Sequence, residues 1–234
     1  AKADVILISG HNGGTGASPA TSIKFAGLPW EMGLTEAHQV LAMNNLRGRV
    51  TLRTDGGLRT GRDIVMAAMM GAEEYGIGTA ALIAMGCIMV RQCQSNTCPV
   101  GVCTQNQELR DKFTGSADKV VNLITFYAQE VREILASIGA RSLSDVIGRA
   151  DLLSQVSRGA DNLDDLDLNP LLIKVDGSNK LVYDRSKTRT EVPDTLDAEI
   201  VSDAARFLND GEKMQLSYAV QNTHRTVGTR VSSH

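Results

Sequence analysis

Aromatic residues are scarce in this chain, and neither a membrane-spanning run nor a charge excess is present. Phe, Trp and Tyr make up 4% of the 234 residues, and with 22 glycines this favours an α/β protein with tight loops over a β-sandwich. No apolar run approaches the roughly 18 residues that a membrane helix needs. The net charge is −3. We therefore expect no membrane segment and no chain-wide basic surface for nucleic acid.

An export signal is also missing from the first residues. A strand-like run, DVILISG, leads at once into a glycine loop, without the apolar region and cleavage pattern of a signal peptide. We expect a cytoplasmic protein. Because the chain opens at Ala1 and goes straight into a strand, we also expect it to be a piece of something longer.

The first hundred residues alternate strand, glycine loop and helix. Strands are predicted at 5–8, 50–52 and 75–85, and helices at 35–46 and 60–70. The first helix has Thr35 as a candidate N-cap, and the second has Thr60 with Asp63 in a capping-box pattern. This order is typical of a parallel α/β fold. Three strands do not complete a barrel.

The later residues have a different character. We predict an amphipathic helix across 116–138 that ends at Gly139, with Ile124 on its buried stripe. Further expected elements are a short helix from Ser142, a surface loop at 157–170, a hairpin with strands at 172–175 and 181–183, a helix at 195–208, and strands cut off mid-element within 214–231.

Glycine clusters follow all three predicted strands. Glycine allows a backbone to turn at positive φ and to approach a phosphate closely. The clusters are Gly13-Gly14-Thr15-Gly16, Gly56-Gly57, and Gly76 with Gly78-Thr79. None is GxGxxG, which argues against a Rossmann dinucleotide site. A cofactor phosphate at these strand ends is the functional interpretation. Tight turns without a ligand are the alternative, and this alternative has the most weight for the first cluster.

Asp55 and His11 are the polar candidates in these loops. A carboxylate at Asp55 can accept hydrogen bonds from ribityl or ribose hydroxyls, or can instead serve as a turn or cap residue. His11 sits in a glycine loop where a ligand would lie, whereas His38 is placed on a helix and is expected to be structural.

All four cysteines lie within residues 87–103. They are Cys87, Cys93, Cys98 and Cys103, spaced C-x5-C-x4-C-x4-C, with Pro99 after Cys98. Such clustering in a chain without an export signal indicates a metal site. The spacing lacks the C-x2-C knuckles of structural zinc, so an iron–sulfur cluster is favoured, with zinc and ordinary buried thiols as alternatives.

Several of these runs resemble glutamate synthase. They are SGHNGGTGASP (9–19), AGLPWEMGL (26–34), TDGGLRTGRD (54–63), GAEEYGIGT (71–79) and GCIMVRQCQSNTCPVGVCTQ (86–105). The resemblance implies the C-terminal part of an FMN-binding (β/α)8 barrel with its iron–sulfur loop over 1–110. It also implies a helical and linker extension over 111–210, and the truncated start of a glycine-rich β-helix domain over 211–234.

The resemblance also implies a site. FMN would be held by Gly13, Gly14, Asp55, Gly56, Gly57, Gly76, Gly78 and Thr79. A three-iron, four-sulfur cluster would be held by Cys87, Cys93 and Cys98. Cys103 departs from the family's usual alanine, so a fourth ligand stays open. No catalytic residue is assigned, because the substrate-side residues of the family precede this region.

The implied activity is the reductive synthesis of L-glutamate from 2-oxoglutarate and glutamine-derived ammonia through 2-iminoglutarate. The implied partners are an amidotransferase domain of the same full-length chain and a donor of electrons, either an NAD(P)H-oxidising small subunit or ferredoxin. The fragment alone is expected to be inactive. The alternatives are another FMN-dependent barrel oxidoreductase, such as a hydroxyacid oxidase, and a zinc-stapled interaction module without enzymatic activity.

Overall fold

The computed structural model describes residues 3–13, 18–160, 164–175, 181–186 and 194–233. They fall into two compact units, residues 1–188 and 189–234. The first unit holds the sheet, the glycine loops and the cysteines. The second holds two short helices and the C-terminal segment.

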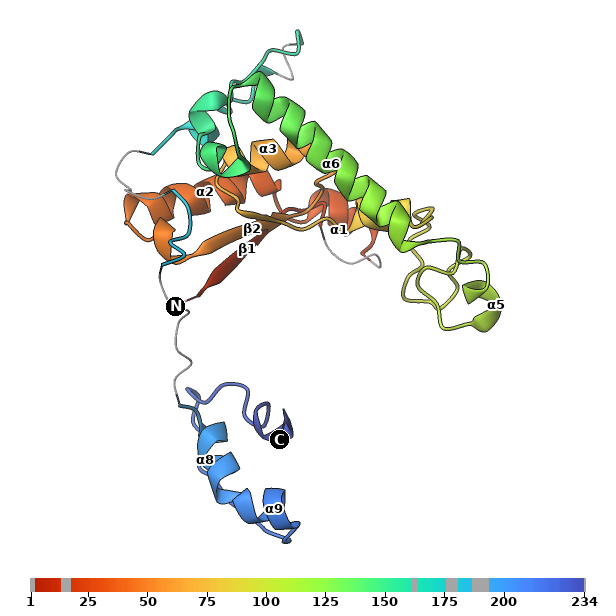
Figure 1. Ribbon diagram of the computed structural model, residues 1–234, viewed down its shortest axis with the longest axis vertical. Coiled ribbons are helices and arrows are strands. Elements are labelled where there is room, and N and C mark those ends of the chain that lie inside the picture. Colours follow the sequence, from red (N-terminus) through yellow and green to blue (C-terminus); the bar gives the residue numbers. More distant parts are fainter. Residues whose placement is uncertain (1–2, 14–17, 161–163, 176–180, 187–193, 234) are drawn as a thin grey trace. The chain divides into compact units, whose positions relative to one another are not determined.

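A three-stranded parallel sheet organises the first unit (Figure 1). Its strands β1 (Val5–Ser9), β2 (Thr51–Asp55) and β3 (Glu74–Tyr75) lie in the order β1-β2-β3. The register pairs Ser9 with Asp55, so the loops that follow these two strands start side by side. The parallel α/β arrangement and the first two strands are therefore confirmed.

The third predicted strand is wrong over most of its length. It ends at Tyr75, and helix α4 (Thr79–Ala84) follows the Gly76-Ile77-Gly78 turn. The sequence of α4 is TAALIA. Alanine and leucine favour a helix more strongly than the apolar character of the run favours a strand, and the glycine turn separates this run from the sheet.

Helices α1 (Ala20–Phe25), α2 (Trp30–Met43) and α3 (Gly61–Met69) connect the strands. Helix α2 begins five residues before Thr35, which is buried inside it and is not its N-cap. Helix α3 has the predicted capping box. The Thr60 hydroxyl accepts from the backbone N–H of Asp63 at 3.1 Å, and the Asp63 carboxylate accepts from the backbone N–H of Thr60 at 3.1 Å.

The main core lies between the sheet and helices α2 and α3. Its fully buried members are Trp30, Leu34, Leu52, Leu58, Ala67, Met70 and Ala72. Strand β1 is only partly covered, because Val5 is 43% and Leu7 is 51% exposed. Within this chain, β1 is therefore an edge strand.

Helix α6 (Ala117–Ser137) lies across α3, as Figure 1 shows, and confirms the helix predicted at 116–138. A Cβ atom at Gly61 would lie 2.8 Å from the Tyr127 carbonyl oxygen, so glycine is what allows the two helices to approach here. The Gly61 backbone N–H also donates to the Glu130 carboxylate at 2.6 Å. Gly139 follows α6 with a φ of +76°.

Short helical turns complete the first unit. They are the 3-10 helices η1 (Arg47–Arg49), η2 (Leu143–Val146), η3 (Ala150–Leu152) and η4 (Asn169–Leu172), together with α5 (Gln107–Arg110). Ser142 and Asp145 form the expected capping box of η2. The described residues of the loop at 157–170 are mostly exposed, as predicted. The described residues flanking 176–180 form no strand, so the hairpin prediction is wrong there, while its tip lies outside the described residues.

The second unit contains α8 (Leu196–Asp203), α9 (Ala205–Asp210) and the 3-10 helix η5 (Val231–Ser233). The two α-helices replace the single one predicted at 195–208. Asp197 ties the C-terminal segment to α8 by accepting from the backbone N–H groups of Gly228 at 2.8 Å and Arg230 at 2.7 Å. The described residues 214–231 contain no strand, so the strands predicted there are wrong.

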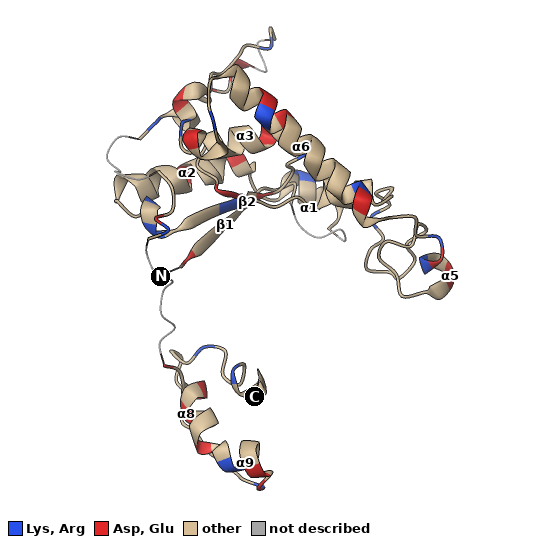
Figure 2. Cartoon of the chain, viewed as in Figure 1, with Lys and Arg blue, Asp and Glu red and all other residues tan. Residues whose placement is uncertain are grey.

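Charged residues of both signs are interspersed along the helices, most visibly on α6 (Figure 2). Among the described residues, no helix is both long enough and apolar enough to cross a membrane.

Candidate functional site

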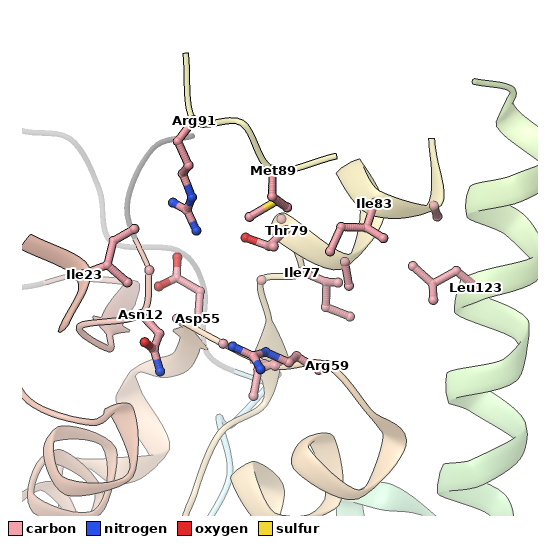
Figure 3. Close-up of a pocket in the computed structure, with 18 residues that line it drawn as sticks. Asn12, Ile23, Asp55, Arg59, Ile77, Thr79, Ile83, Met89, Arg91 and Leu123 are labelled. Atoms are coloured by element: carbon pink, nitrogen blue, oxygen red, sulfur yellow. The ribbon is translucent and has the colours of Figure 1, made fainter. Parts of the chain in front are cut away.

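A cavity of about 760 Å³ opens at the carboxyl ends of β2 and β3 (Figure 3). Its volume lies in the range of small-molecule and cofactor sites. One side is apolar, formed by Ile77, Ile83, Met89 and Leu123, and the polar side carries Asn12, Asp55 and two arginines. Parallel α/β sheets place ligands at this edge. The cavity therefore lies where the glycine clusters predict it.

Asp55 is the polar centre of this cavity. It is the last residue of β2, and its Oδ1 atom is buried without a hydrogen-bond partner among the described residues. A buried acceptor that lacks a donor is costly. A ligand hydroxyl would supply that donor, which agrees with the ribityl-binding role expected for this carboxylate.

Two of the predicted glycines have a protein-packing reason of their own. A Cβ atom at Gly56 would lie 2.6 Å from the Gly10 nitrogen, and one at Gly76 would lie 2.8 Å from the Asp55 Cβ. The loops after the three strands therefore touch one another closely. Gly56 and Gly76 bring these loops together, and their role at a ligand is indirect.

Gly78 differs from these two glycines. A Cβ atom built on it would meet nothing within 4 Å, although Gly78 and Thr79 both line the cavity. Gly57, at a φ of +118°, lines the cavity too and contacts Asn12. The absence of side chains here leaves the backbone of the loop open to a ligand, the arrangement by which N–H groups hold phosphates.

The first glycine cluster contributes in part. Gly13 lines the cavity, and its backbone N–H donates to the Gly10 carbonyl at 2.8 Å. Gly14 lies outside the described residues. His11 lines two neighbouring hollows rather than this cavity, and its Nδ1 atom is buried without a partner among the described residues. His38 is buried and structural, as expected.

All four cysteines line a second, narrow cavity of about 20 Å³. Cys87 lies just after α4, with its Sγ atom 3.9 Å from the Met89 Sδ. All four thiols are free. Cys98 is buried, and the other three are half-buried. The structure therefore brings together thiols that are spread over 17 residues of loop. They would have to separate to take in a cluster.

Hydrogen bonds distinguish Cys98 from Cys103. Burial opposes ionisation of the Cys98 thiol, but backbone N–H groups of Cys103, Val100 and Val102 outweigh it and lower its pKa. Burial, with the neighbouring thiols of Cys93 and Cys98, raises the pKa of Cys103 to about 12. Because the thiolate is the form that binds metals, the backbone N–H groups around Cys98 favour ligation by this thiol.

The chemistry of the donor set suits a soft metal or an iron–sulfur cluster. The set consists of thiols alone, on a loop with N–H groups directed at sulfur. Among the residues that the structure describes, no three Cys, His, Asp or Glu side chains have the geometry of a single-ion site.

Sequence reasoning missed the arginines of this site. Arg59 and Arg91 line the large cavity, and Met89 and Arg91 also line the cysteine cavity. Arg91 lies in the first interval of the cysteine motif and Arg59 just after a glycine pair, but the motif reasoning considered only the cysteines and glycines. The available signal was position: Arg59 follows the Gly56-Gly57 turn, and Arg91 lies two residues before Cys93.

Comparisons with known proteins agree with this picture. The family described as a conserved region in glutamate synthase matches residues 1–141. The chain is 70% identical to the large chain of glutamate synthase (NADPH) of Azospirillum brasilense over 100% of its own length and 15% of the relative's. It is 48% identical to the corresponding chain of Bacillus subtilis over 100% and 15% of the two lengths. Ferredoxin-dependent glutamate synthase 2 of Synechocystis is 51% identical, over 99% and 15%.

Similarity to solved structures is weaker. A mutant flavocytochrome b2 with pyruvate bound gives a TM-score of 0.43 at 20% identity, covering 82% of this chain and 38% of that one. The chain spans about 15% of the length of its curated relatives, and the family match covers more than half of it. By that match and these identities, the chain belongs to the glutamate synthase family.

Proposed function

We propose that this chain is the flavin- and cluster-binding part of a full-length glutamate synthase. The full-length enzyme would make L-glutamate from 2-oxoglutarate and glutamine-derived ammonia through 2-iminoglutarate. The observation that carries the proposal is the pair of adjoining cavities. One is lined by Asp55, whose Oδ1 atom has no hydrogen-bond partner among the described residues, and the other is lined by four thiols. Family membership supplies the reaction.

FMN is the proposed occupant of the large cavity, where it would supply hydride transfer when bound. Asp55 accepts from the ribityl hydroxyls. Backbone N–H groups of the loops at Gly56-Gly57 and Gly78-Thr79 hold the phosphate. Gly13 and Gly76 complete the binding set by keeping the three loops close, and Gly14 is included from the family resemblance alone. The apolar side of the cavity excludes water from the ring.

A 3Fe-4S cluster is the proposed occupant of the cysteine site, with Cys87, Cys93 and Cys98 as ligands. The backbone N–H groups that lower the pKa of Cys98 support its role as a ligand, and the family resemblance, which covers the first three cysteines, is the reason for leaving Cys103 out. N–H groups of the loop stabilise the charge on sulfur and so tune the potential.

The proposed architecture follows from the family. Residues 1–110 would be the C-terminal part of an FMN-binding (β/α)8 barrel, residues 111–210 a helical extension, and residues 211–234 the start of a β-helix domain. The exposed face of β1 supports a barrel continued by strands from elsewhere in the full-length chain. We place NADPH first as electron source, through a small subunit, because the 70% identical relative is named for it. Ferredoxin is the alternative.

Composition of the purified protein tests this function. A full-length family member that carries this region, purified without oxygen, is expected to hold FMN, iron and acid-labile sulfide, and to lack stoichiometric zinc. Zinc without sulfide would overturn the cluster and favour the interaction module. Flavin without iron or sulfide would favour a different flavin-dependent oxidoreductase.

A further inference from the structure

Two residues separate the large cavity from the cysteine cavity. Among the described residues that line the two spaces, only Met89 and Arg91 belong to both. They stand on the segment that runs from α4 to Cys93. These two side chains therefore lie next to any group bound in either cavity.

The backbone of this segment is unusual. Met89 has a φ of +59° and Arg91 a φ of +62°, both in the left-handed region that side chains other than glycine rarely adopt. Residues are held in such conformations where the surrounding structure requires them, and functional sites are a common place for this. Here the conformation directs both side chains to the shared wall.

Arg91 has no partner of its own. It is half-buried, and within the described ranges it makes neither a hydrogen bond nor an ion pair. The ion-paired arginines of the described structure, by contrast, are Arg47, Arg53 and Arg149. Figure 3 shows the guanidinium group of Arg91 directed into the cavity, toward Asp55. A cation in a concave site with one apolar wall is a binding group for an anion or a strong acceptor.

We propose that Arg91 is the anchor for the anionic flavin nucleotide in the large cavity and, from the shared wall, sets the potentials of both the flavin and the cysteine-bound cluster. This proposal rests on the proposed function above. Asp55 and Arg91 then bind different groups of the flavin nucleotide. The carboxylate accepts from its hydroxyls, and the guanidinium donates to its acceptor oxygens or nitrogens.

The electrostatic part follows from the sign of the charge. Reduction of a flavin or of an iron–sulfur cluster adds negative charge to it. A fixed cation beside the site stabilises the reduced form, and its effect is large where water is excluded. Removal of the Arg91 charge should therefore lower both potentials. Arg59 lines the large cavity but not the cysteine cavity, so its charge should act on the flavin alone.

Three substitutions in a full-length family member test the proposal: Arg91→Gln, Arg91→Lys and, as a matched control, Arg59→Gln. Arg110→Gln, on α5 and outside both cavities, controls for the loss of one positive charge. The measurements are flavin dissociation by fluorescence, potentials of both centres by spectroelectrochemistry, and the paramagnetic signal of the oxidised cluster.

We expect Arg91→Gln to weaken flavin binding about tenfold or more, the loss typical of a charged hydrogen bond, and to lower both potentials. Arg91→Lys should keep both potentials near those of the unmodified enzyme and bind flavin more weakly. Arg59→Gln should leave the reduction potential of the cluster unchanged. Arg110→Gln should leave the potentials of both the flavin and the cluster unchanged. Cluster content should stay complete throughout.

Unchanged flavin affinity and potentials in Arg91→Gln would overturn the proposal, and so would a cluster potential that moves equally in Arg110→Gln. If Arg91→Gln does not fold, an Arg91→Lys enzyme with unaltered flavin affinity overturns the anchoring role. An unmodified enzyme without flavin or without iron and sulfide would instead overturn the proposed function, which separates the two failures.

Discussion

Gly78 offers the cleanest single-residue probe of the large cavity. Its φ is −98°, which other residues adopt readily, and its Cβ position is open. A Cβ atom there would enter ligand space and meet no protein atom within 4 Å. Gly56 and Gly57 are poorer probes, because their φ values of +103° and +118° would strain any substitution.

We expect Gly78→Val to reduce FMN retention sharply in a full-length enzyme while the melting temperature changes little. Gly57→Val should lose flavin as well, but with a lower melting temperature from backbone strain. Flavin content after gel filtration and thermal unfolding are the two measurements. Stoichiometric FMN in Gly78→Val would place the flavin elsewhere.

His38 and Arg47 form a buried polar network that motif analysis does not detect. The Arg47 side chain is fully buried and donates to the Val50 carbonyl at 2.7 Å and to the Gly71 carbonyl at 2.9 Å. It also donates to the Glu73 carboxylate at 2.6 Å and to His38 Nδ1 at 3.1 Å. Because Nδ1 is an acceptor here, His38 must be neutral for the network to form.

Burial and the charge of Arg47 lower the pKa of His38 from 6.5 to about 4. The unfolded chain binds this proton near its ordinary pKa, so the contribution to stability is complete above pH 6.5 and is lost as pH falls toward 4. The difference corresponds to about 3 kcal/mol. We expect the His38 ring protons to titrate near pH 4 by NMR in the folded protein. A midpoint near 6.5 would contradict the network.

At the scale of elements, substitutions in the cysteine loop test which of its four thiols are cluster ligands. Cys87→Ser, Cys93→Ser and Cys98→Ser are each expected to abolish the cluster. Cys103→Ser should keep the paramagnetic signal of an oxidised three-iron cluster, since the family resemblance covers only the first three cysteines. Electron paramagnetic resonance with iron and sulfide analysis measures this. Loss of the cluster in Cys103→Ser, with retention in any other variant, would reverse the assignment.

Helix α6 corrects one expectation. Ile124 was predicted to be buried, but it is 45% exposed, because the helix packs on α3 through its later turns. Its buried side chains are Tyr127 and Leu135. The predicted helix is therefore right. How much of its apolar stripe is buried depends on how far the neighbouring helix α3 extends along it.

Leu135→Ala is expected to destabilise the packing of α6 on α3 by about 2–4 kcal/mol, the cost of a buried cavity. Ile124→Ala should lower the free energy of unfolding by less than about 1 kcal/mol, because this side chain is largely exposed. Hydrogen exchange of the α3 and α6 amides measures both. Equal acceleration in the two variants would show that Ile124 is covered after all.

At the scale of the whole molecule, β1 leaves apolar side chains uncovered. An edge strand with exposed apolar residues invites pairing with another strand, and in the proposed barrel that strand belongs to the rest of the full-length chain. We expect Leu7→Asp to lower the melting temperature of a full-length enzyme markedly, although Leu7 is 51% exposed in this chain. An unchanged melting temperature would show that β1 is a true edge.

Sequence alone determined the local features of this protein. The capping pair Thr60 and Asp63, the apolar periodicity of α6 and the first two strands follow from neighbours in the chain, which is why they were predictable. The cysteine spacing and the shared runs likewise identify the family without coordinates. These features depend on interactions across a few residues.

Only the tertiary structure decided which residues meet. It showed that Gly56 and Gly76 pack the loops against one another, that Arg91 reaches the same cavity as Asp55, and that Arg47 is buried. It also turned the expected third strand into α4, where helix propensity prevailed beyond a glycine turn. Such outcomes depend on contacts between residues far apart in the chain, and spacing along the sequence carries no information about those distances.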